Sequence, residues 1–576
     1  MRWPSLRRRL VVWYHPSFRL PFSGNALGGG IDPRRADHVL TWLLDERIVH
    51  DRDVHEAPEA HYSDLRRVHE DSWLAALDDN STVAGLLGMS GVVPVASMVE
   101  LWRRGVGGTL AAARWVADES GVAASLMGGF HHSGPALGAG FCGLNDIAVA
   151  IAVRRSEGLE GTILVLDLDA HPPDGLAAFA LPDVEIRSVS GDSEWTADGV
   201  FDVRVPLGSG DAPYLHAVDK ALDTDTRPVL AFYLAGSDPA VGDALGGLSV
   251  TAEGLRERDR RVFRRLNGVP TVVVPGGGYS PRSWALLAGT LAEATRSRKS
   301  VPSSYDPIAR KIGRVARTLA PFEEEITITE ADLGSLLGGP RHDRRFLEHY
   351  TRHGLEHALD QYGLFDTLRR MGFSAIELEV QAEAMPHRLR VFGEFAGERH
   401  KLMELVLSFR AVESWQTLFI EWLELVDPRA SVGRPRPDLP GQASRGLGMA
   451  RDVASILDVA TARLKLDGLS FVPSHFHVAW MARNQAQFID PVARGKFRAL
   501  RKYLRDVSLA EASAAVAEGL PTEDGDLIRW TPSLMVRAHS PELLEWIRST
   551  ERQAANCERD TLFQLLPVEV PFPQLR

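Results

Sequence analysis

Cysteine is scarce in this sequence. Only Cys142 and Cys557 occur among 576 residues, so a disulfide framework cannot support the fold, and a reducing compartment is expected. Long uncharged apolar runs are also missing, which excludes a transmembrane helix. The basic N-terminus is followed by only a short apolar run that ends at His15 and Pro16, unlike a secretory signal. We therefore expect a soluble, cytoplasmic protein that does not enter a membrane.

An excess of basic charge is missing as well. The chain has 65 Lys and Arg against 76 Asp and Glu, a formal net charge of -11 and an isoelectric point near 6.0. Nucleic-acid-binding domains usually carry a basic surface, so we expect no nucleic-acid partner. The hydrophobic content of 44% is sufficient for a sizeable core. The length predicts two or three domains.

The first 300 residues alternate strand-like and helical patterns. Short apolar runs rich in β-branched or aromatic residues, typical of strands buried on both faces, lie at residues 161–168, 228–235 and 269–274. Residues 145–156 form an apolar helical pattern that Asn145 can cap. This alternation predicts βα units and an α/β fold with a parallel sheet flanked by helices.

The composition changes near residue 300. Residues 296–307 are polar and contain two prolines, so we predict a linker there and two domains, 1–300 and 301–576. The second half is predicted to be an α+β domain. Its strand candidates are residues 375–381 and 389–391, and its helix candidates are residues 449–464 and 491–504. Residues 402–409 and 418–425 fit either a strand or a helix. No family is identified there; partner binding and oligomerisation are both open to this domain.

Two further groups in the second half have structural explanations. His475 and His477 flank Phe476 in a candidate strand, and structural histidines are favoured over a metal site because no third ligand is near. Glu421 and Glu424 are expected on the polar side of a helix or strand rather than as an acid/base pair. A Pro/Gly-rich loop at residues 427–447 either meets an acidic partner or is solvated; its arginines are Arg429, Arg434, Arg436 and Arg445.

Polar side chains follow each apolar run of the first half. Asp167, Asp169 and His171 follow the first run, where alternate residues of an extended chain face one side. Asp238 follows the second run, and the glycines before Tyr279 follow the third. His131 and His132 come from another segment, after residues 123–129. Ligands of parallel sheets bind beyond the carboxyl ends of strands, so we expect these side chains at one edge.

Several buried carboxylates need a compensating cation. Asp169, His171 and Asp238 supply two carboxylates and one imidazole, which leaves a position for water, as in a catalytic zinc site. We therefore predict Zn²⁺ at these residues, with Fe²⁺ as the alternative. Such an ion lowers the pKa of water and polarises a carbonyl group.

The spacing of the motifs resembles the histone deacetylase family, with class IV and bacterial deacetylase-like members the most similar. The resemblance covers roughly residues 10–295, and spaced motifs in consistent order are more specific than any single one. The motifs are residues 128–132 (GGFHH), 140–146 (GFCGLND), 167–175 (DLDAHPPDG), 242–248 (GDALGGL) and 276–279 (GGGY), with Tyr14-His15-Pro16 and Val68-His69 in support.

The resemblance implies an arginase/deacetylase-like fold and an amide hydrolase that removes acyl groups from acylated lysine or a related amine. It places zinc on Asp169, His171 and Asp238. It assigns catalytic roles to His132 as general base and acid backed by Asp174, to His131 paired with Asp167, and to Tyr279 as donor to the oxyanion. Substrate contacts fall to Gly140, Phe141 and Gly277. A structural K⁺ would match Asp167, Asp169, His171 and Ser190.

The sequence departs from the family pattern in two places. Family members carry His or Gln and then Gly after the metal histidine, whereas Pro172 and Pro173 stand here. Prolines fix φ and remove backbone donors, so a displaced loop around Asp174 is one expectation. Residues 190–199 lack the usual His and Pro-Gly pattern, which leaves the acyl-chain preference open.

Other functions account for fewer of these residues. An acetylpolyamine or small-amide hydrolase is the alternative within enzymes, and a non-catalytic acyl-ligand binding or scaffold protein is the alternative outside them. A phosphotransferase with an Asp-x-Asp strand end leaves the histidines and Tyr279 unused. An iron oxygenase triad reverses the ligand count. Taken alone, Asp238 could cap a helix that begins at Pro239.

Overall fold

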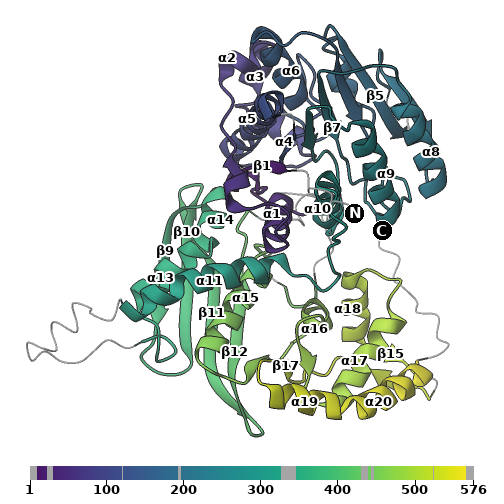
Figure 1. Ribbon diagram of the computed structural model, residues 1–576. Coiled ribbons are helices and arrows are strands. Elements are labelled where there is room, and N and C mark those ends of the chain that lie inside the picture. Colours follow the sequence, from purple (N-terminus) through teal and green to yellow (C-terminus); the bar gives the residue numbers. More distant parts are fainter. Residues whose placement is uncertain are drawn as a thin grey trace, which may run out of the picture. The chain divides into compact units, whose positions relative to one another are not determined.

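The computed structural model describes residues 9–22, 30–119, 121–192, 196–325, 345–429, 439–442, 446–522 and 524–565, apart from the side chains of 320–325 (Figure 1). These residues form two compact units. The first consists mainly of residues up to Arg310, and the second of most of the remainder.

The first unit is built on an eight-stranded sheet whose strand order is β2-β1-β3-β8-β7-β4-β5-β6. Every neighbouring pair in it is parallel. Its strands are β1 (Leu10–Tyr14), β2 (Val54–Glu56), β3 (Val122–Ser125), β4 (Ile163–Asp167), β5 (Val184–Gly191), β6 (Phe201–Val205), β7 (Leu230–Leu234) and β8 (Thr271–Val274). The predicted α/β class with a parallel sheet is confirmed.

The three apolar runs of the sequence form the centre of this sheet. They contain β4, β7 and β8, which lie side by side, and every residue of these strands is buried. Both faces are covered, so the sequence shows continuous apolar residues rather than alternation. The carboxyl ends of the three strands therefore meet at one edge.

Helices connect and flank the strands (Figure 1). They are α1 (Arg35–Asp45), α2 (Tyr62–Leu65), α3 (Asp71–Ala76), α4 (Asn80–Leu86), α5 (Val95–Glu119), α6 (Asp146–Ser156), α7 (Asp174–Ala177), α8 (Asp211–Leu222), α9 (Ala252–Arg265) and α10 (Ser283–Ala294). Asn145 caps α6 as expected, because its side chain accepts the N–H of Ala148 at 2.9 Å. A bilayer-spanning helix is not found in the described part of the chain, since none of its helices joins the required length to sufficient apolarity.

The second unit holds a seven-stranded mixed sheet in the order β14-β17-β13-β12-β11-β10-β9. Its strands are β9 (Ser374–Gln381), β10 (His387–Phe395), β11 (Glu398–Val412), β12 (Trp415–Leu425), β13 (Gly468–Phe471), β14 (Gln487–Phe488) and β17 (Met535–Ala538), and β15 (Leu520–Pro521) pairs separately with β16 (Leu527–Ile528). Its helices are α11 (Pro307–Glu325), α13 (Arg352–Gln361), α14 (Leu364–Arg370), α15 (Ala450–Arg463), α16 (Phe476–Ala482), α17 (Pro491–Tyr503), α18 (Leu509–Glu518), α19 (Pro541–Ser549) and α20 (Glu551–Gln564). The predicted α+β domain is confirmed.

The strand predicted around Phe476 is wrong. β13 ends at Phe471, and His475 is the N-cap residue of α16. The apolar run was too short to separate strand from helix, and Pro473 interrupts it because proline cannot donate to a ladder. The rings of His475 and His477 still lie together, stacked with centroids 5.4 Å apart.

The remaining polar groups of the second half behave differently from one another. Glu421 and Glu424 lie on β12. Glu421 accepts the hydroxyl of Ser408 at 2.7 Å, and Glu424 pairs with Lys401 at 2.9 Å, so both form the polar side of a strand as expected. Arg429 is buried and pairs with Asp427 at 2.9 Å, so the solvated-loop interpretation is wrong for this residue. Arg434, Arg436 and Arg445 lie outside the described residues.

Close contact between α5 and the segment before it gives a stability prediction. A Cβ atom at Gly107 would lie 1.9 Å from the backbone oxygen of Pro58, whereas one at Gly289 on α10 would meet nothing within 4 Å. We expect Gly107→Ala to lower the unfolding free energy by about 1–3 kcal/mol through overpacking. The control Gly289→Ala should be neutral or stabilising by up to about 1 kcal/mol. Calorimetry of the full chain tests this, and equal effects of the two substitutions would contradict the packing.

Candidate metal centre and active site

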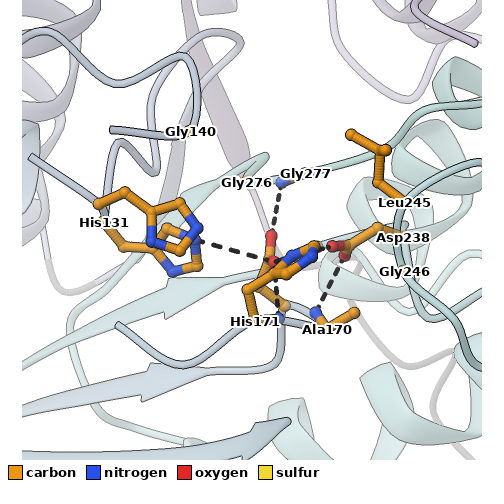
Figure 2. Close-up of polar contacts among 12 residues, drawn as sticks. His131, Gly140, Ala170, His171, Asp238, Leu245, Gly246, Gly276 and Gly277 are labelled. Atoms are coloured by element: carbon orange, nitrogen blue, oxygen red, sulfur yellow. Dashed lines mark hydrogen bonds and ion pairs between the residues drawn. The ribbon is translucent and has the colours of Figure 1, made fainter. Parts of the chain in front are cut away.

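Three ligand-type side chains converge beyond the ends of β4 and β7. One ligand atom each from Asp169, His171 and Asp238 lies within 4.8 Å of the others. Nδ1 of His171 is 3.1 Å from Oδ1 of Asp169 and 3.2 Å from Oδ2 of Asp238. Figure 2 shows the ring of His171 facing the carboxylate of Asp238. The structure therefore brings together the three residues expected to hold a metal.

Backbone atoms fix the two carboxylates. The N–H of Gly277 donates to Oδ2 of Asp169 at 2.6 Å, and the N–H of Ala170 donates to Oδ1 of Asp238 at 3.2 Å. A Cβ atom at Gly277 would lie 2.7 Å from Oδ2 of Asp169 and 2.8 Å from Oδ2 of Asp238. Glycine is thus the residue that lets the backbone approach both acids.

The chemistry of this cluster fits a divalent cation. Asp169 and Asp238 are both buried, and His171 is the ion-pair partner of Oδ2 of Asp238. Burial raises the pKa of Asp238 to about 8. Burial opposes protonation of His171, yet its bonds to Asp169 and Asp238 raise its pKa to about 11. Two buried carboxylates beside one imidazole are thus a donor set that a divalent cation would neutralise.

His131 lies beside this cluster and is backed by Asp167. Its Nδ1 is 2.8 Å from Oδ2 of Asp167, and its Nε2 is 3.8 Å from Oδ1 of Asp169. Burial lowers the pKa of His131, but the charges of Asp167 and Asp169 outweigh burial and raise it to about 9. This imidazole is therefore charged near neutral pH.

His132 has the opposite protonation state. Its Nδ1 lies 2.6 Å from Oδ1 of Asp174, whereas burial and the neighbouring His131 lower its pKa to about 4. Asp174 begins α7 directly after Pro173. Asp174 therefore reaches His132 despite Pro172 and Pro173, and the pair that the two prolines put in doubt is formed.

The aromatic side of the site is formed by Phe141 and Tyr279, whose ring centroids lie 5.8 Å apart. Burial raises the pKa of the Tyr279 hydroxyl well above 10, so it stays protonated. Gly140 has a φ of 51°, and a Cβ atom there would lie 2.5 Å from Cδ2 of His132. The segment that carries Gly140 and Phe141 therefore packs directly on His132.

Three charged residues that support the site were not singled out from the sequence. Arg35 on α1 donates to the oxygens of Gly276 at 2.7 Å and Gly277 at 3.1 Å. Asp243 accepts the N–H of Tyr279 at 2.6 Å. Asp146 accepts the N–H groups of Gly129 at 3.0 Å and Phe130 at 2.9 Å, which fixes the segment before His131. Asp146 lies within the motif at residues 140–146 and Asp243 within the motif at residues 242–248, but nothing in the sequence marks Arg35.

Two other expectations from the sequence, a potassium site and a helix cap, are not supported by the contacts of their residues. Ser190 is buried, and its hydroxyl donates to the carboxylate of Asp202 at 2.7 Å. This contact does not test binding of potassium, and the potassium site stays a prediction. The alternative that Asp238 caps a helix at Pro239 is wrong, because no helix begins there in the described chain.

His69 supports the same region and gives a pH prediction. Its Nε2 accepts the N–H of Asn145 at 3.0 Å, and its Nδ1 lies 3.0 Å from the oxygen of Gly134, so the neutral ring is required. Burial lowers its pKa from 6.5 to about 4. Between these pH values the unfolded chain binds a proton that the folded chain excludes, so stability is lost as pH falls.

Because the folded protein excludes this proton, we expect its free energy of unfolding to fall by roughly 3 kcal/mol as the pH is lowered from 6.5 to 4. The free energy of unfolding, measured across this pH range, should therefore fall more steeply for the wild type than for His69→Gln, whose side chain cannot be protonated. Parallel curves would show that His69 does not stay neutral in the folded state.

Comparison with known proteins agrees with the site. Residues 31–295 match the family model described as the histone deacetylase domain. Histone deacetylase 2 of Arabidopsis thaliana is 29% identical over 310 residues, which are 50% of this chain and 79% of that protein. An uncharacterized protein of Picosynechococcus sp. is 33% identical over 248 residues, 41% of this chain and 82% of that protein. A crystal structure of an HDAC homolog complexed with SAHA, 20% identical, covers 51% of this chain and 85% of its own with a TM-score of 0.43. The chain belongs to the histone deacetylase family and is a hydrolase of the deacetylase type.

Proposed function

We propose that this protein is a zinc-dependent deacylase that hydrolyses the amide of an acylated lysine in a protein or peptide. The observation that carries the proposal is the Asp169, His171 and Asp238 cluster beside two histidines, each backed by its own carboxylate. All proposed catalytic residues lie within residues 1–300, which we assign as the catalytic domain. Residues 301–576 then form a second, α+β domain, for which partner binding and oligomerisation both stay open.

Asp169, His171 and Asp238 are the proposed zinc ligands, since two oxygens and one nitrogen leave room for a reacting group. Zinc supplies Lewis acidity there, which polarises the amide carbonyl and makes water more acidic. The glycine backbone at Gly236 and Gly277 keeps bulky groups away from the two carboxylates. Asp167 remains outside the ligand set because its carboxylate bonds His131.

His132 is the proposed general base. Its low pKa keeps the ring neutral near pH 7, and Asp174 holds the proton on Nδ1, so Nε2 is the nitrogen that accepts a proton. The protonated ring then donates to the leaving amine. The charged His131 alongside it stabilises negative charge that develops during attack.

Tyr279 is the proposed oxyanion donor. Its hydroxyl stays protonated, and the bond from its N–H to Asp243 fixes its backbone. Phe141 packs near Tyr279 and is the proposed apolar wall for the acyl chain. Gly140, which packs on His132, and Gly277, which packs on Asp169, are the proposed contacts to the substrate amide. A non-catalytic scaffold would not need His131, His132 and Tyr279, whereas a deacylase gives each of them a role.

Hydrolysis assays test this function. The full-length protein loaded with zinc should hydrolyse an acetyl-lysine peptide, and His132→Ala should lower kcat/KM about 10²–10⁴-fold with unchanged zinc content. The matched control is His216→Ala, an exposed histidine on α8 whose loss should change neither value.

Long-acyl-lysine peptides and acetylpolyamines are assayed in parallel. A preference for acetylpolyamines would replace the lysine substrate with a small amine. A zinc-loaded protein that hydrolyses none of the three, or an unimpaired His132→Ala variant, would refute the deacylase.

A further inference from the structure

A buried ion pair lies on α9, outside the set of residues assigned to catalysis. Arg258 and Asp259 are each only 1% exposed, and Nε of Arg258 donates to Oδ1 of Asp259 at 2.9 Å. The same carboxylate accepts the hydroxyl of Tyr233 at 2.6 Å and that of Thr290 at 2.7 Å. Asp259 thus accepts three hydrogen bonds, one of which holds Nε of Arg258 in place.

The other end of the guanidinium contacts the two segments that carry the acidic metal ligands. Nη1 of Arg258 donates to the backbone oxygen of Gly236 at 2.6 Å and approaches that of Leu168 at 3.4 Å. Leu168 directly precedes Asp169, and Gly236 lies two residues before Asp238. The hydroxyl of Tyr214 also donates to the oxygen of Leu168, at 3.3 Å.

These carbonyl groups lie where the sheet no longer satisfies them. β4 ends at Asp167 and β7 ends at Leu234, so Leu168 and Gly236 come after the strands. Buried backbone oxygens need a donor, but a neutral donor would be sufficient. A buried ion pair is weak evidence for stability, because desolvation offsets its attraction. What arginine adds is a rigid, planar set of donors that can hold several acceptors in one geometry.

We propose that Arg258 is a positioning residue of the metal centre. By binding Gly236 and Leu168 together it sets the separation of the Asp238 and Asp169 carboxylates that one divalent ion requires. Close packing transmits this control, since a Cβ atom on Gly236 would lie 2.6 Å from Cα of Asp169. The inference rests on the metal centre of the proposed function.

The test measures metal affinity rather than activity. In the full-length protein, Zn²⁺ affinity is determined by competition with a chelator, and the absorption spectrum of bound Co²⁺ reports the ligand arrangement. Arg258→Met should weaken Zn²⁺ binding about 10–100-fold, as loss of outer partners of metal ligands does. Arg264→Met, on the exposed side of the same helix, should bind as the wild type does.

Two more variants separate positioning from simple destabilisation. Arg258→Met with Asp259→Asn removes both buried charges, and Arg258→Lys keeps the ion pair but loses the planar fork. We expect both to unfold closer to the wild-type temperature than Arg258→Met alone, yet to bind Zn²⁺ more weakly than the wild type and with an altered Co²⁺ spectrum. Wild-type affinity in either variant overturns the proposal.

Zn²⁺ binding by the wild-type protein separates failure of the proposed function from failure of the positioning role of Arg258. A wild type that binds no Zn²⁺ refutes the proposed function together with this inference. A wild type that binds Zn²⁺, together with wild-type affinity in either of these two variants, refutes the inference alone.

Discussion

The close approach of two buried carboxylates is the constraint on which the rest of the site depends. Asp169 and Asp238 both lie against Nδ1 of His171, away from water. Ionised carboxylates repel each other in such a place unless positive charge is added. Burial raises the pKa of Asp238, and the two carboxylates raise the pKa of His171, which is the direction expected where negative charge is crowded. A divalent ion supplies the positive charge and gives the site its proposed chemistry.

The surrounding fold keeps this unfavourable arrangement in place. Parallel strands buried on both faces deliver the acids to one edge, and glycine backbone packs where side chains would collide with them. Long-range contacts then hold the loops. Arg35 and Asp243 fix the segment that ends in Tyr279, and Asp146 fixes the segment that leads into the paired histidines. The two histidines differ in protonation because their surroundings differ, which suits one as base and the other as electrostatic support.

Much of the first unit could be predicted because its signals are local. β4, β7 and β8 read as continuous apolar runs, and alternate polar residues at the end of β4 indicate one shared face. Long-range partners carry no such signal. Arg35 contacts Gly277 across 242 residues of sequence, and Arg258 bonds the backbone of two other segments, at Leu168 and Gly236. The histidine pair in the second half was misassigned to a strand because a short apolar run fits either element, and only the tertiary context decides.

The central claim is that Asp169, His171 and Asp238 hold one zinc ion together. A crystal of the zinc-loaded protein, with anomalous diffraction recorded at the zinc absorption edge, tests it most directly. The account predicts one strong anomalous peak at about 2.0–2.2 Å from a carboxylate oxygen of each aspartate and from Nδ1 of His171. An anomalous map with no peak among these three side chains, or with the zinc bound elsewhere, would contradict it.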